Sequence, residues 1–125
     1  KTYMVKIIIK DTRYKKFSNK KYRDAYIEAH IRRLIGNQIR KIRKDRNTRK
    51  TELCRILNIS KKKLSKIENL EYQNISLKLL LKLSKIFDIA LTVRFAHFTD
   101  YFKNDLDKLS PDDIIIKSFE KQFDT

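Results

Sequence analysis

Residues 48–69 carry the pattern that most restricts the fold of this chain. Their inward-facing side chains recur at helical spacing in two short groups, Leu53, Cys54 and Leu57 in the first and Ile59, Leu64 and Ile67 in the second. Between them, Asn58 tolerates the left-handed conformation of a tight helix exit, and Ser60 suits the N-cap of the next helix. The pattern predicts a helix-turn-helix, because neither short helix can bury its apolar face alone.

Charge is distributed unevenly along the 125 residues, a length typical of one domain. The net charge is +16, and residues 1–66 hold 23 basic and 5 acidic side chains while residues 67–125 hold 8 and 10. This asymmetry favours a polyanionic partner for the first half, foremost nucleic acid, although any single lysine can simply keep the protein soluble. No apolar stretch is long enough to span a bilayer, and a single cysteine fits a reducing cytoplasm.

Periodicity outside the motif predicts further elements. Helical spacing covers 22–46, where Gly36 marks a bend, a break between two helices or a close contact, and 77–87, which Ser76 caps. Thr48 is the cap expected for the first motif helix. Alternation predicts short strands at both ends, so we divide the chain into an N-terminal strand and basic connection (1–21), a helix-turn-helix domain with a following strand over 90–96 (22–96), and an acidic, partly ordered tail (97–125).

Four sequence runs resemble the Cro/repressor type of helix-turn-helix proteins, often called Xre-like. They are Glu52-Leu53, Leu57-Asn58-Ile59-Ser60, Leu64-Ser65-Lys66-Ile67-Glu68-Asn69 and the run from Leu80 to Ile89. The resemblance covers roughly residues 34–96 and implies a mainly α, compact lambda-repressor-like bundle of about five helices. It also implies binding to operator DNA, usually as a dimer, with the second motif helix in the major groove.

The candidate DNA-binding residues follow from the outward side of the second motif helix. With Leu64 and Ile67 inward, this helix presents basic and polar side chains, namely Lys61, Lys62, Lys63, Ser65, Lys66 and Asn69. We expect Lys61, Lys62 and Ser65 to reach base edges, and Lys66 and Asn69 to lie nearer the phosphates.

Three basic residues before this helix extend the expected interface. Lys50 and the free N–H groups at the start of the first motif helix suit a phosphate. Arg40 and Arg43 enlarge the basic surface, unless one of them forms an intramolecular ion pair with Glu68.

Other chemistries find little support in the sequence. His30 and His97 have no metal-ligand partners at suitable spacing, and Asp112 and Asp113 have no convergent base or nucleophile. Cys54 is expected on the inner side of its helix, where a catalytic thiol is improbable. We therefore expect no enzymatic activity, no cofactor and no bound metal.

The resulting hypothesis is a dimeric, sequence-specific transcriptional repressor that binds double-stranded DNA in the cytoplasm. Two alternatives remain open. One is the antitoxin of a toxin–antitoxin pair, which would also bind a cognate toxin protein. The other is a nucleic-acid-binding protein of low specificity, because Lys50 replaces a Gln that is frequent in the family and Lys61, Lys62 and Lys63 replace frequent Gln, Ser and Thr.

Overall fold

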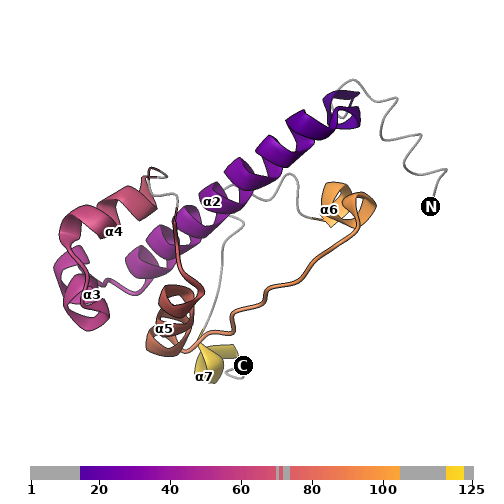
Figure 1. The fold of residues 1–125 in the computed structure, drawn as a ribbon. Helices are drawn as coiled ribbons and strands as arrows, with labels where there is room; N and C mark the ends of the chain where they lie inside the picture. The colour runs from indigo at the N-terminus through magenta and orange to yellow at the C-terminus, as the bar shows by residue number, and fades with distance from the viewer. Residues whose placement is uncertain (1–14, 70, 72–73, 105–117, 123–125) are drawn as a thin grey trace.

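The computed structural model describes residues 15–69, 71, 74–104 and 118–122, and regular structure in these residues is helical (Figure 1). The elements in chain order are η1 (Lys15–Ser18), α2 (Lys20–Asp45), α3 (Lys50–Leu57), α4 (Lys61–Glu68), α5 (Leu77–Phe87), α6 (Phe98–Asn104) and α7 (Phe119–Gln122). The mainly α fold predicted from the sequence is confirmed.

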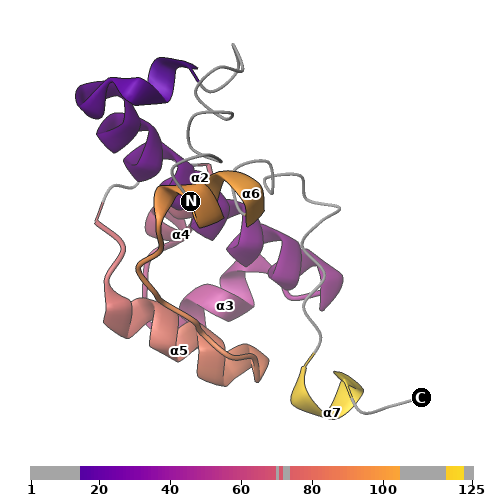
Figure 2. The same cartoon turned by 90° about the vertical axis from the view of Figure 1, so that its right-hand side faces the viewer.

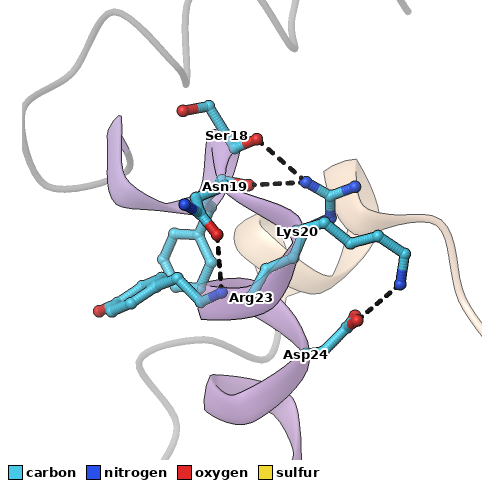
Figure 3. Close-up of polar contacts among 7 residues, drawn as sticks. Ser18, Asn19, Lys20, Arg23 and Asp24 are labelled. Carbon is cyan, nitrogen blue, oxygen red and sulfur yellow. Dashed lines mark hydrogen bonds and ion pairs between the residues drawn. The ribbon is translucent and has the colours of Figure 1, made fainter.

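Helix α2 is the longest helix described. Helices α3, α4 and α5 lie near its C-terminal end, and η1 and α6 lie near its N-terminal end (Figure 1). Its 26 residues span about 39 Å at 1.5 Å per residue. At its start the side chain of Asn19 accepts a hydrogen bond from the N–H of Tyr22 at 3.1 Å. The guanidinium of Arg23 donates to the carbonyls of Phe17 and Ser18 at 3.3 and 3.2 Å (Figure 3). These bonds fix η1 to α2, because they satisfy free groups at the junction of the two helices.

Gly36 lies inside α2, which continues through it without interruption. The helix predicted over 22–46 is therefore a single helix, and a break at Gly36 is excluded. Gly36 is buried, at a position where any larger residue would add a side chain beneath the surface. Its cost in an exposed helix, about 1 kcal/mol relative to Ala, does not prevent helix formation here.

The main core joins the C-terminal half of α2 to α3, α4 and α5. Its buried members are Ile39, Ile42, Leu53, Cys54, Leu57, Leu64, Ile67, Leu79, Leu83 and Phe87. Leu53, Leu64 and Ile67 are among the most deeply buried side chains of the described residues. The core predicted for the helix-turn-helix is thus confirmed, and Ile59 packs against it from the turn.

A second, smaller core of aromatic side chains joins η1, the N-terminal half of α2, and α6. Phe17 lies against Tyr26 and Phe102, with ring centroids 4.8 and 4.9 Å apart respectively. His30 is buried beside Tyr26 and Tyr101, so this histidine has a packing role. The sequence did not predict this cluster, because η1 falls in the expected connection and α6 falls in the segment expected to be an acidic tail.

The strand predicted over residues 90–96 is wrong for the described chain, where these residues run from α5 to α6 without a strand partner (Figure 2). A strand requires a neighbouring backbone to complete its hydrogen bonds, and no described segment pairs with this one. The strand predicted within residues 1–10 lies outside the described residues.

Candidate nucleic-acid interface

Helices α3 and α4 are joined by a three-residue turn whose backbone matches the prediction. Asn58 adopts the left-handed conformation, with φ 57° and ψ 49°, and the N–H of Ile59 donates to the carbonyl of Cys54 at 3.0 Å. The hydroxyl of Ser60 then accepts the N–H of Lys63 at 3.0 Å and caps α4. The turn is therefore set by local chemistry, because an Asn at a left-handed helix exit and a Ser at an N-cap are both favourable.

The start of α3 differs from the expectation that Thr48 caps it. The N-cap is Arg49, which makes no side-chain capping bond, while the hydroxyl of Thr48 turns back to the carbonyl of Arg46 at 3.4 Å. Without a capping oxygen, the first N–H groups of α3 are not satisfied by the N-cap side chain. They remain suited to an anion, because the positive end of the helix dipole lies there.

Arg43, one of the predicted DNA contacts, is buried in an ion pair with Glu68. Its Nε and Nη2 atoms each donate to the carboxylate of Glu68 at 2.8 Å, and Nη1 donates to the carbonyl of Thr48 at 3.1 Å. Both side chains are buried, and hydrogen bonding to Glu68 raises the pKa of Arg43. The alternative of an intramolecular ion pair with Glu68 is confirmed for Arg43, and the bonds of Arg43 join α2, the connection between α2 and α3, and α4.

Both carboxylates of the helix-turn-helix segment are paired with arginine. Besides Glu68, the only other is Glu52, whose Oε1 accepts from Nε of Arg49 at 2.9 Å, and this hydrogen bond lowers the pKa of Glu52. The same segment contains seven lysines and arginines. Within residues 48–69 both negative charges are therefore paired, and the segment carries a net positive charge that attracts phosphate.

The side chains predicted to face DNA on α4 differ in exposure. Lys61, Lys62, Lys66 and Asn69 are exposed, as the helical pattern predicts, whereas Lys63 and Ser65 are half-buried. Because Leu64 and Ile67 point into the core, the exposed set follows the outer side of the helix. Three of these four residues lie on α4, and Asn69 is its C-cap.

Lys50 and Ser65 connect the start of α3 to the middle of α4. The ammonium Nζ of Lys50 donates to the hydroxyl Oγ of Ser65 at 3.3 Å, and both side chains are half-buried. An ammonium has three donors, so Lys50 retains donors for a phosphate while it makes this bond. Two residues predicted separately from the sequence therefore belong to one contact.

Arg40 is exposed on α2, away from the turn in sequence, and is not brought to α4 by any bond that the structure gives. Sequence reasoning missed Arg49, whose exposed guanidinium lies at the N-cap of α3 next to Lys50. Arg49 and Glu52 lie three residues apart at a helix start, and this spacing could have predicted the ion pair between them.

Arg46 and Lys82 are basic side chains that serve the fold. The guanidinium of Arg46 donates to the carbonyl of Phe87, the last residue of α5, and lies over the Phe87 ring at 5.3 Å from its centroid. Lys82 donates to the carbonyl of Leu57 at the end of α3, at 3.5 Å. Both act where a cation is favourable, because helix C-termini carry unpaired carbonyls and partial negative charge.

The described residues contain no group of three or more His, Cys, Asp or Glu side chains that could hold a metal ion. Cys54 is buried in the core, and burial raises the pKa of its thiol, so the reactive thiolate is disfavoured. None of the helices described is long and apolar enough to cross a membrane.

Fold and surface together define a basic helix-turn-helix protein, in which two short helices cross over a shared core and the second presents exposed lysines. Residues 39–93 match the model of the family described as Helix-turn-helix, and this match supports the resemblance to the Cro/repressor type (Xre-like) proteins. The protein is accordingly a DNA-binding transcription regulator. Comparisons with curated proteins and with solved structures each gave no match.

Proposed function

We propose that the protein is a sequence-specific repressor that binds operator DNA as a homodimer, with α4 in the major groove. The observation that carries the proposal is the basic face of α3 and α4, whose two carboxylates are both paired with arginine. A repressor of this kind acts by occupancy, since a bound dimer blocks access of polymerase to the operator. A two-fold dimer would bind a palindrome with half-sites about 34 Å apart.

Contacts divide into those that select bases and those that grip phosphates. Lys61, Lys62 and Ser65 lie in the first five residues of α4, the part of a recognition helix that usually reaches base edges. We assign the phosphates to Lys50, Lys66, Asn69 and Arg40, together with the uncapped N–H groups of α3. We assign Lys63 to the phosphates as well. Its side chain is half-buried near the start of α4, so it is less available to base edges.

Low-specificity binding is the second candidate, and the lysine triplet Lys61, Lys62 and Lys63 favours it. Lysine attracts phosphate as a point charge but lacks the two-point geometry by which Gln or Arg recognise a base. An antitoxin role would use the same DNA-binding face and require a toxin on another surface, for which exposed Val93 and Phe95 are available.

Selection of duplexes from a randomised library at about 0.2 M salt tests these proposals, because phosphate-only binding weakens steeply with salt. Enrichment of a palindrome would support the dimeric repressor. Tight binding only at low salt, with no sequence enriched, would contradict it and favour the low-specificity binder. Enrichment that appears only when the product of a neighbouring toxin gene is added would favour the antitoxin.

A further inference from the structure

Residues 90–96, between α5 and α6, form no regular structure and no backbone hydrogen bond with the part of the chain that the structure describes. Backbone hydrogen bonds close the helix ends around it, from the N–H of Ile89 to the carbonyl of Ser84 and from the N–H of Tyr101 to the carbonyl of His97, each 3.0 Å long. Residues 90–96 make no such bond with any other described residue. This leaves a row of free N–H and C=O groups, which is how the edge of a β-sheet presents itself to another strand.

The side chains of the same segment are apolar at alternate positions, and two of the three are exposed. Val93 is 74% exposed and Phe95 is 105% exposed, whereas Leu91 is half-buried. β-Branched and aromatic residues favour strands, and exposed apolar side chains that form a contiguous patch mark a binding surface. Among the described residues, the segment thus has the side-chain pattern of a strand and no strand beside it.

We propose that residues 90–96 pair antiparallel with the same residues of a second copy, around a two-fold axis at Val93. In this register Val93 faces Val93, Leu91 faces Phe95, and Thr92 faces Arg94. Each copy then gains backbone hydrogen bonds that no described residue of its own chain supplies, and the pairing is closed because the same surface is used on both sides. The inference rests on the dimeric regulator proposed above and identifies its interface.

Charge favours a second copy over the N-terminal residues of the same chain. In the centred register Arg94 lies opposite Thr92, so no two like charges face each other directly. Residues 1–10, which also alternate, bring three lysines, Lys1, Lys6 and Lys10, and no carboxylate. Their pairing with a segment that carries Arg94 would bring up to three lysines beside that cation, whereas a second copy brings one Arg94, diagonally across the ribbon.

A two-stranded ribbon is only marginally stable in water, so the dimer needs additional apolar contact. The flanking helices provide exposed apolar side chains for this purpose. Leu77 and Leu81 lie one turn apart on α5 and are 58% and 43% exposed, and Phe98 at the start of α6 is 40% exposed. The connection, α5 and α6 can all be followed in the view of Figure 2.

Cysteine cross-linking tests the register directly on the full chain. Facing residues in an antiparallel pair have Cβ atoms about 4.5–5.5 Å apart, close enough for a disulfide after slight adjustment. Oxidised Val93→Cys should form a covalent dimer. Thr92→Cys alone should not, because its partner is Arg94, whereas the double variant Thr92→Cys with Arg94→Cys should. The unmodified chain is the control, because its single cysteine, Cys54, is buried.

Sedimentation without DNA tests the contribution of the side chains. Phe95→Lys should raise the dimer dissociation constant at least about tenfold, since it removes an apolar contact near the centre of the interface. Ile56→Lys is the matched control, because Ile56 is a half-exposed apolar residue on α3, outside this segment, and its change should leave the dimer intact.

Several outcomes would overturn the proposal. A chain that stays monomeric, a dimer that Phe95→Lys does not weaken, a Thr92→Cys dimer that cross-links as readily as Val93→Cys, or an intramolecular Val5→Cys to Val93→Cys disulfide would each do so. The duplex selection separates this failure from failure of the proposed function. A palindrome enriched by a chain that does not cross-link refutes only the interface, whereas a cross-linked dimer that enriches no sequence refutes the function.

Discussion

The guanidinium of Arg43 on α2 forms two parallel 2.8 Å hydrogen bonds with the carboxylate of Glu68 in the last turn of α4. The charges are buried, and the third donor of Arg43 holds the carbonyl of Thr48 just before α3. One side chain therefore fixes the orientation of both motif helices relative to α2. The angle between α4 and α2 depends on this pair.

Removing one partner of this pair should destabilise the protein strongly. Arg43→Met leaves the Glu68 carboxylate buried without its cation, so the free energy of unfolding in urea should fall by about 3–5 kcal/mol. The double variant Arg43→Met with Glu68→Leu should recover most of the loss, because no buried charge remains. An Arg43→Met protein of unchanged stability but weaker DNA binding would instead show that Arg43 contacts DNA.

The left-handed residues at two helix exits should respond to substitution in the same way. Asn58 after α3 and Asp88 after α5 have φ values of 57° and 55°. Alanine is disfavoured in this conformation by roughly 1–2 kcal/mol, whereas glycine adopts it freely. Thermal unfolding should therefore show a lower midpoint for Asn58→Ala and Asp88→Ala than for the corresponding glycine variants. Equal midpoints for alanine and glycine would contradict a left-handed requirement.

The aromatic cluster should unfold separately from the main core. Phe17→Ala removes the ring that contacts Tyr26 and Phe102, so we expect faster amide hydrogen exchange in α6 and in the first turns of α2. Amides of α3 and α4 should keep their protection, and DNA binding should persist. Leu64→Ala is the comparison, because it opens the main core and should accelerate exchange in α3 and α4. Loss of protection throughout the chain in Phe17→Ala would indicate one cooperative unit.

Local signals explain what the sequence predicted well. Ser60 and Ser76 cap their helices as expected, and Asn58 adopts the expected conformation, because each depends only on neighbouring residues. The prediction failed where a distant partner decides the outcome. Residues 90–96 have a strand pattern but no neighbouring strand in the described chain, and Phe98–Asn104 forms a helix whose Phe102 packs on Phe17, far away in sequence.

In the candidate site, too, features set by neighbouring residues were predictable and features set by distant residues were not. Exposure of Lys61, Lys62 and Lys66 follows from helical spacing around a buried Leu64, so it was predictable. Whether Arg40 or Arg43 pairs with Glu68 depends on how α2 packs on α4, which no local pattern reveals.

Lys50 and Ser65 should behave as a coupled pair in DNA binding. If Lys50 holds a phosphate, Lys50→Ala should reduce the salt dependence of the binding constant by about one unit of slope. Ser65→Ala should weaken binding less, and its effect should shrink once Lys50 is absent, because the 3.3 Å bond between them is already lost. Additive losses in the double variant would contradict the coupling, and an unchanged slope for Lys50→Ala would exclude a phosphate contact.

Lys62 should determine sequence preference, whereas Lys66 should not. Both are exposed on α4, but Lys62 is its second residue and Lys66 lies in its last turn, farther from the expected base edges. Measured on an enriched duplex and on single-base variants of it, Lys62→Ala should change discrimination at one position by about 1–3 kcal/mol. Lys66→Ala carries the same loss of charge and should weaken all duplexes equally. If Lys62→Ala also weakens every duplex by the same factor, α4 acts through phosphate attraction alone and the low-specificity function is the correct one.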